Sequence, residues 1–371
     1  MSRTQKIESI MEIVRTVVGM LIAYTVALII LFAVSEQPVY IIRQFVLGPF
    51  SSLRRIGSVI NLAIPFTLCG LAMCFMYAVN RFNLAPEGIF MMSGCIVSWV
   101  AITLGDGVPA VIMVPLLFIV AAATGVVIAF IPAIMERKFE ANVVVVSLML
   151  NSVLAYLATA ILRYCMKDNT ITYVASVELP DSAQLPSILG SFKIQSGVFI
   201  AIAAVIIVSL VFYKTSFGWK MRIVGSNPKF ATAMGLSAVG VSFTAQLVGG
   251  AVAGIAGATE IMGNYTRYQW TSTTQHGFDG LLVAVLAKKN PVLVPIGALL
   301  LAYIRIGADV VNTSGDIPSE FITVIQGIII LLIAAESFMS GIKNKMIFKA
   351  SRKAEEERIA AEAAKKEEKG E

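Results

Sequence analysis

The chain has 371 residues, of which 57% are hydrophobic and 14% are charged, and its formal net charge is +6. A soluble domain carries about 25% charged residues, so this composition excludes an ordinary soluble protein. Most basic residues lie in short loops and tails, which argues against a nucleic-acid-binding protein. The sequence therefore predicts an all-α, polytopic membrane protein.

Apolar stretches predict about ten transmembrane helices, because a spanning helix needs about 20 mostly apolar residues. The eighth stretch, GFDGLLVAVLA, is too short to cross a bilayer, and we interpret it as a half-helix. The third stretch is also short and follows the interrupted segment NRFNLAPEG. The expected spans are 17–34, 56–79, 88–104, 110–131, 142–162, 198–213, 241–262, 277–287, 292–311 and 319–338.

The two weak spans occupy matching places in two five-helix groups that enter the membrane in opposite senses. Short or interrupted segments in corresponding positions are typical of inverted-repeat transporters and lie near their substrate path. This arrangement suggests an inverted repeat, although no similarity between the halves is visible in the residues themselves.

Basic loop residues indicate the orientation of the chain, because cytoplasmic loops are enriched in Lys and Arg. With the N-terminus inside, inner segments carry twelve basic residues against seven in outer segments, and the tail adds nine. Both termini are therefore expected in the cytoplasm. The same topology gives a membrane domain over 1–340, a cytoplasmic loop at 214–240, an outer loop at 163–197 and a charged cytoplasmic tail at 341–371.

The residues offer little for enzyme chemistry. The sequence contains no G-x-x-x-x-G-K-[ST] loop for ATP, and its single histidine, His276, rules out a histidine cluster for a metal. Arg305 and Asp309 lie four residues apart on one face of the ninth span. They are interpreted as a structural ion pair, with a substrate contact as the alternative.

Four polar residues mark a candidate solute path. Asp279 opens the half-helix, either as a partner of the helix dipole or beside the solute route. Glu87 follows Pro86 and either caps the helix that it begins or contacts a ligand. Amide side chains in spans need hydrogen-bond partners, so they join helices or line a polar path. The predicted pathway residues are Asn83, Glu87, Asn151 and Asp279.

The seventh span contains GGAVAGIAGATE, in which small residues recur every four positions. Such spacing allows two helix backbones to approach closely. Gly250, Gly254 and Gly257 are therefore predicted to lie in helix packing contacts.

A short basic helix is predicted inside the loop 214–240. Asn227 is a suitable N-cap and Pro228 a suitable first helical residue, and Gly235 is a natural stop. A helix lying on the membrane surface is the alternative, but it would need a larger apolar face than PKFATAM offers.

Four motifs together resemble the inner-membrane permeases of binding-protein-dependent ABC importers. They are FNLAPEG at 82–88, NVVVVSLMLNSV at 142–153, GWKMRIVGSNPKFATAMGLS at 218–237 and HGFDGLLVAVLAKKNP at 276–291. The resemblance covers roughly 56–335 and is greatest to the branch for nucleosides or simple sugars, whose receptors are basic-membrane-protein-type lipoproteins. The chain departs from the family pattern at Ala85–Pro86, at Ala141–Asn142 and at Ala287.

The resemblance implies a permease subunit that translocates a small polar solute, a nucleoside first and a simple sugar next. It implies a second permease subunit, identical or different, an extracytoplasmic solute-binding lipoprotein, and a cytoplasmic ATPase that binds ATP and Mg²⁺, with no cofactor on this chain. It also implies that the helix at 227–236 couples to the ATPase through Asn227, Pro228, Lys229, Ala231 and Gly235. A secondary transporter driven by an ion gradient is the other interpretation, with Asp279, Asp309 and Glu260 as its ion-coupling candidates.

Overall fold

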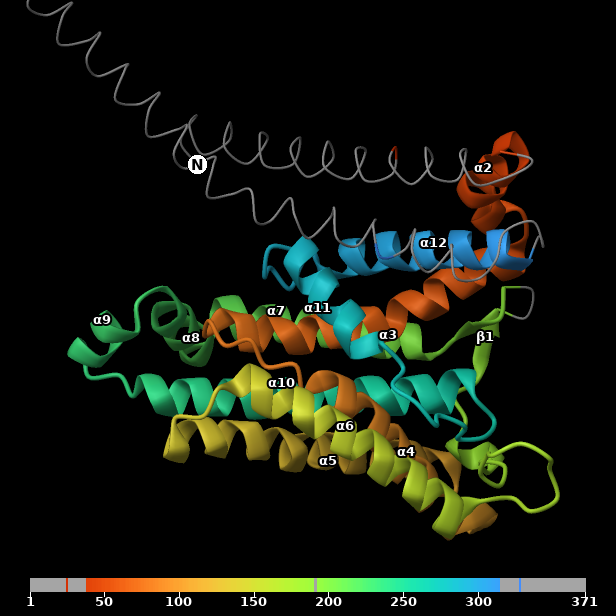
Figure 1. The fold of residues 1–371 in the computed structure, drawn as a ribbon, viewed down its shortest axis with the longest axis horizontal. Coiled ribbons are helices and arrows are strands. Elements are labelled where there is room, and N and C mark those ends of the chain that lie inside the picture. Colours follow the sequence, from red (N-terminus) through yellow and green to blue (C-terminus); the bar gives the residue numbers. More distant parts are fainter. Residues whose placement is uncertain (1–24, 26–37, 190–191, 314–326, 328–371) are drawn as a thin grey trace, which may run out of the picture. The chain divides into compact units, whose positions relative to one another are not determined.

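A computed structural model describes residues 25, 38–189, 192–313 and 327, and these residues are mostly helical. Figure 1 shows the long helices running alongside one another, with α8 and α9 at one end of the bundle and β1 towards the other. All of these elements belong to one unit, Val34–Ile322. The helices are α2 (Pro38–Leu47), α3 (Leu53–Ala78), α4 (Pro86–Leu104), α5 (Ala110–Phe139), α6 (Val143–Ile161), α7 (Gly197–Lys214), α8 (Ser216–Ser226), α9 (Pro228–Ala233), α10 (Ala238–Asn264), α11 (His276–Leu286) and α12 (Val294–Thr313).

Several helices begin at side chains that satisfy their first amides. Asn142 accepts hydrogen bonds from the amides of Val144 and Val145 at the start of α6, and Ser237 accepts one from Gly240 at the start of α10. These N-caps replace partners that the first turn of a helix lacks. Polar residues at the loop ends therefore help to set where these two helices begin.

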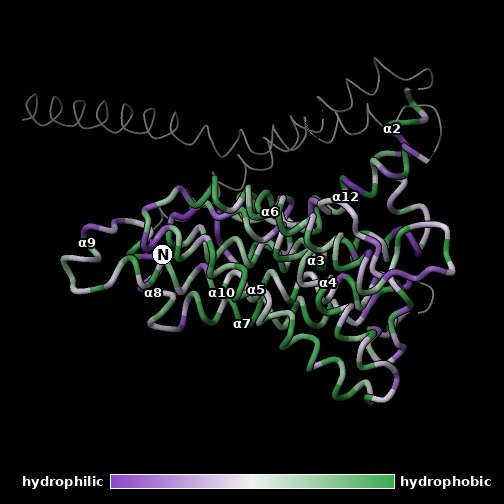
Figure 2. The backbone as a smooth tube through the Cα atoms, turned by 60° about the horizontal axis from the view of Figure 1, so that its bottom comes forward, coloured by the Kyte–Doolittle hydropathy of each residue, from purple (hydrophilic) through white to green (hydrophobic). Residues whose placement is uncertain are grey.

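Seven helices in the described part of the chain are long and apolar enough to cross a membrane, namely α3, α4, α5, α6, α7, α10 and α12. Figure 2 shows hydrophobic residues along much of their length. The predicted half-helix is α11, whose 11 residues extend about 16 Å. The expected spans at 17–34 and 319–338 lie outside the described residues, as does the tail at 341–371. The count of ten and the inverted repeat stay predictions.

The centre of the bundle is formed by α3 and α10. Helix α10 packs against α3, α4 and α5, and α11 packs against α3. The small residues of α10 lie in these contacts: a Cβ at Gly254 would overlap the carbonyl oxygen of Ala121 on α5. A Cβ at Gly257 would overlap the carbonyl oxygen of Phe90 on α4, and a Cβ at Gly250 would overlap Ala129 and the carbonyl oxygen of Gly125 on α5. The three glycines thus lie where close helix packing requires them.

The described residues also contain two helices and a pair of strands that the hydropathy pattern does not predict. Helix α2 occupies part of the expected first outer loop, and α8 occupies the first half of the 214–240 loop. The expected outer loop 163–197 carries a short antiparallel pair, β1 (Ser187–Leu189) and β2 (Ile194–Gln195). These elements are too short to give a clear periodic signal, because hydropathy detects apolar runs of spanning length.

Candidate functional site

The N-termini of α4 and α11 meet inside the bundle, although 190 residues separate their contacting amino acids. Gly277 lies so close to Glu87 that a Cβ at Gly277 would overlap the backbone nitrogen and Cα of Glu87. The start of α11 also lies beside Phe66, about three turns from the end of α3. Two helices that begin within the bundle are the arrangement expected of interrupted segments near a substrate path.

Glu87 lies in the first turn of α4, as expected, and its carboxylate caps the N-terminus of α11, a partner that the sequence does not indicate. Its Oε1 accepts a hydrogen bond from the amide of Gln275 at 2.7 Å, and its Oε2 accepts one from Gly277 at 2.7 Å. Thr274 Oγ1 donates to Oε1 at 3.3 Å. The side chain is fully buried, and the negative carboxylate faces the positive end of the α11 dipole. Glu87 therefore ties the start of α11 to the start of α4.

Arg305 forms its ion pair with Asp279, not with Asp309 four residues along α12. The Arg305 Nη2 to Asp279 Oδ1 distance is 2.6 Å, and Asp309 is exposed. Asp279 is 2% exposed, so its charge needs this partner in an apolar bundle. Asp279 Oδ2 and Arg305 Nε have no hydrogen-bond partner among the residues that the structure describes. The pair holds α11 against α12 and leaves one acceptor and one donor for a further polar group.

Asn83 and Asn151 hold the irregular segment that leads into α4. Asn151 on α6 donates from Nδ2 to the carbonyl of Leu84 and accepts at Oδ1 from the amide of Gly88. Asn83 accepts from the amide of Ala85 and donates to Gln246 on α10, at 2.9 and 2.8 Å. Both side chains are buried. Their visible role is to satisfy backbone groups between helices, and their role as pathway residues stays a prediction.

A column of rings covers the meeting point of α4 and α11. The His276 ring lies parallel to Phe90, with ring centroids 5.0 Å apart, and Phe90 stacks on Trp270 at 5.2 Å. His276 also contacts Phe66 at 5.7 Å. These rings come from α3, α4, the stretch before α11 and α11 itself, and spacing along the chain does not connect them. They cover the capped start of α11 with apolar surface.

Helix α9 matches the predicted helix in the loop 214–240. Asn227 accepts from the amide of Phe230 at 3.0 Å, Pro228 is the first helical residue, and Gly235 follows the helix with φ +81°. Ala231 is fully buried and anchors the helix. Lys229 is exposed, so α9 presents a basic residue at the end of the bundle.

An ion-pair cluster lies among the residues expected in the outer loops. Arg267 Nη1 is 2.6 Å from Asp168 Oδ2, and Arg267 Nη2 is 3.0 Å from Glu178 Oε1. Thr170 donates twice to Asp168, from its hydroxyl at 2.6 Å and from its amide at 2.8 Å. Hydrogen bonds from Thr170 and then from Arg267 lower the pKa of Asp168 to about 2. The cluster joins the stretch after α6 to the stretch after α10.

Several apolar helices of spanning length, with ionisable groups buried at broken helix starts, define the class of polytopic membrane transport proteins. The model of a family described as "Branched-chain amino acid transport system / permease component" matches residues 55–334. The chain belongs to this permease family. It is therefore a multi-pass protein of the plasma membrane and a transport subunit, and the family implies an ATPase partner and a binding protein.

Curated relatives match most of the chain. It is 31% identical over 305 residues to the guanosine ABC transporter permease protein NupP of Bacillus subtilis, which covers 81% of this chain and 86% of the relative. It is 29% identical over 332 residues to the glucose ABC transporter permease protein TsgB13 of Haloferax volcanii, covering 87% of each. The nucleoside ABC transporter permease protein NupB of Lactococcus lactis subsp. cremoris is 25% identical over 328 residues, covering 86% of this chain and 90% of the relative.

Proposed function

We propose that this chain is the permease subunit of an ABC importer for nucleosides. The names of two relatives support the substrate class, since one is a guanosine permease and another a nucleoside permease. Simple sugars are the second candidate, because a glucose permease is similar over 87% of the chain. ATP and Mg²⁺ are bound by a separate cytoplasmic ATPase, and a solute-binding lipoprotein delivers the solute from outside.

The observation that carries the coupling proposal is the form of α9. It is a capped helix of six residues at the end of the bundle, between α8 and the long helix α10. Phe230 and Met234 are 54% and 49% exposed, beside the exposed Lys229. Exposed apolar side chains grouped with a cation are suited to docking into a cleft of another protein. We assign α9 as the helix that contacts the ATPase.

The orientation with both termini in the cytoplasm places α9 on the ATPase side of the membrane. It is supported by the excess of basic residues in the segments on that side. In this orientation the Asp168–Arg267 cluster and the β1–β2 pair face the receptor. A second permease subunit, identical or different, completes the transmembrane path, and 341–371 remains a cytoplasmic tail.

Within one subunit, the path runs beside the starts of α4 and α11. Glu87, Asp279, Asn83 and Asn151 lie there. The atoms of the Asp279–Arg305 pair that lack a partner among the described residues can bind the hydroxyl groups of a solute. Movement of α9 would reach this region through α10, which follows α9 directly. Alternation between two discrete packings of the helices would then open the path to each side in turn.

The test measures ATP hydrolysis by the complex reconstituted with its ATPase, with and without solute-loaded receptor. Gly235→Val strains a left-handed position, and Lys229→Glu reverses an exposed charge, so both should lower stimulated hydrolysis and uptake together. Lys138→Glu is the matched control, because it makes the same charge change on an exposed residue at the end of α5. Full stimulation of both α9 variants in assembled complexes would refute the coupling role.

A further inference from the structure

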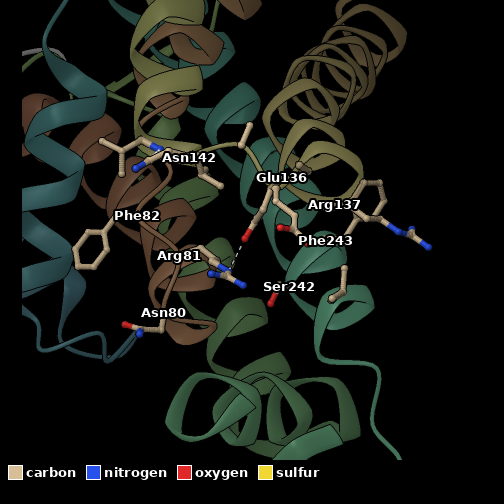
Figure 3. A pocket seen from close by; sticks show the side chains of 14 residues that line it. Asn80, Arg81, Phe82, Glu136, Arg137, Asn142, Ser242 and Phe243 are labelled. Carbon is tan, nitrogen blue, oxygen red and sulfur yellow. Dashed lines mark hydrogen bonds and ion pairs between the residues drawn. The ribbon is translucent and has the colours of Figure 1, made fainter. Parts of the chain in front are cut away.

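A cavity of about 490 Å³ opens where α3, α5, α6 and α10 come together at the end of the bundle that also carries α9. We call it the helix-end pocket; Arg81, Phe82, Glu136, Asn142, Ser242 and Phe243 are among its lining residues. Pockets of about 300–1,000 Å³ suit small-molecule ligands. Figure 3 shows Arg81 directed at Glu136, whereas Arg137 extends away from that pair.

The charges around the helix-end pocket balance one another. Its lining holds two basic residues, Arg81 and Arg137, and two acidic residues, Glu136 and Glu140, and Arg81 Nε lies 2.7 Å from Glu136 Oε1. Arg137 lies over the ring of Phe243, with 5.3 Å between its Cζ and the ring centroid. A strongly anionic or cationic ligand therefore gains little net attraction here. A neutral solute with several hydrogen-bonding groups fits the lining better.

The lining also offers aromatic surface next to polar groups. Phe82 is 52% exposed and contacts Tyr77 edge-on, which leaves part of its ring available for stacking. Arg81 supplies N–H donors and Glu136 supplies acceptors, and Asn142 and Ser242 add side chains that bind hydroxyl or amide groups. A nucleobase stacks on an aromatic ring and a ribose presents hydroxyl groups, so a nucleoside matches both features.

A continuous set of hydrogen bonds connects this pocket to the segment before α4. Glu136 Oε2 accepts from Gln246 Nε2 at 2.8 Å, and Gln246 Oε1 accepts from Asn83 Nδ2 at 2.8 Å. Asn83 in turn accepts from the amide of Ala85, two residues before the Glu87 that caps α11. A solute that draws Arg81 away from Glu136 would thus disturb the hydrogen bonds that hold the segment before α4, beside the proposed path.

We propose that the helix-end pocket is a nucleoside-binding site at the cytoplasmic end of the path, with Phe82 as its stacking surface and the Arg81–Glu136 pair as its polar contact. The proposal rests on the proposed function for its substrate class and its orientation. It assigns to the permease a second point of solute selection, separate from the receptor.

The test uses the full permease alone in nanodiscs, without ATPase or receptor. Cys165 is replaced by serine because it is exposed, and Val239→Cys places a thiol in the pocket lining, while Ser226→Cys places one on α8 outside it. Guanosine and uridine should slow maleimide labelling at Val239→Cys and leave Ser226→Cys unchanged. Glucose and leucine should protect neither position.

Variants of the stacking ring then test the assignment directly. Phe82→Ala should raise the guanosine concentration that gives half-protection by about tenfold, since stacking contributes that much per base. Phe199→Ala is the matched control, because it removes an exposed ring from α7, away from the pocket. Equal protection in Phe82→Ala and wild type would overturn the role of the ring.

Two further results would overturn the site. One is an absence of guanosine protection in a permease whose complete complex imports guanosine, a result that leaves the proposed function intact. The other is protection that changes when phosphatidylethanolamine in the nanodisc is replaced by phosphatidylglycerol but does not change when the nucleoside is added. A complex that imports glucose and no nucleoside would instead refute the proposed substrate. If glucose then also protected Val239→Cys, the pocket would not be a nucleoside site.

Discussion

Replacing Glu87 with glutamine should loosen α11 from the bundle while leaving the size of the side chain nearly unchanged. The carboxylate accepts hydrogen bonds from the amides of Gln275 and Gly277, both at 2.7 Å, in a fully buried position. Glutamine keeps one acceptor oxygen and presents an NH₂ group to the other amide. Loss of one charged hydrogen bond, with a buried amide left unpaired, costs about 2–4 kcal/mol.

The native thiol of Cys69 reports this loosening. Cys69 is fully buried on α3, and its Cβ lies so close to Gly280 of α11 that no side chain fits between them. Detachment of α11 therefore exposes Cys69. A cost of about 2–4 kcal/mol corresponds to roughly 30- to 700-fold faster labelling of Cys69 under conditions where opening is in rapid equilibrium.

The assay is native-state thiol labelling followed by mass spectrometry, in a chain with Cys165→Ser. Cys95 provides an internal control, because its thiol faces the carbonyl of Ala158 on α6. Glu140→Gln is the matched variant, since Glu140 is exposed at the end of α5. Labelling of Cys95 should stay as in wild type, and if Cys69 in Glu87→Gln also labels as slowly as in wild type, Glu87 does not hold α11 in place.

Three other predictions concern packing, acid and the ion pair. Gly254→Val should destabilise the bundle by about 1–3 kcal/mol or more, because its side chain would overlap the Ala121 carbonyl; thermal unfolding in detergent measures this. The Asp168–Arg267 contact depends on an ionised Asp168. Because its pKa is lowered to about 2 from an unfolded value of about 3.9, its stabilising contribution is present above pH 4 and lost as the pH falls towards 2. Proteolysis of the loop around Asp168 should rise over that range in wild type and already at neutral pH in Asp168→Asn. Asp279→Asn should lower uptake per folded molecule, and unchanged uptake would remove Asp279 from the proposed path.

The spanning helices could be predicted from the sequence, because their apolar length is a local property. All eight predicted stretches that fall in the described residues coincide with helices, including the half-helix at α11. The α9 helix could also be predicted, because Asn227, Pro228 and Gly235 start and end it through contacts with residues next to them in the sequence. The short helix α8 and the β1–β2 pair were not, because neither has a long apolar run.

The partners of the buried charges could not be predicted from spacing. Arg305 and Asp309 are four residues apart on one helix, yet Arg305 pairs with Asp279 on α11, where burial makes an unpaired carboxylate most costly. Glu87 begins α4 but caps α11, because the N-termini of the two helices meet in the folded chain. Each of these contacts depends on how helices distant in sequence pack together.

ATP-driven nucleoside uptake is the most direct test that this chain is the permease of an ABC importer for nucleosides. The chain is reconstituted in proteoliposomes with its ATPase, and loaded receptor and labelled guanosine are supplied on the receptor side. We expect guanosine to accumulate only with ATP hydrolysis and to go on accumulating when an ionophore removes ion gradients. Uptake that proceeds with the permease chain alone, or collapses with the ionophore while ATP is held constant, would contradict it and indicate an ion-coupled transporter.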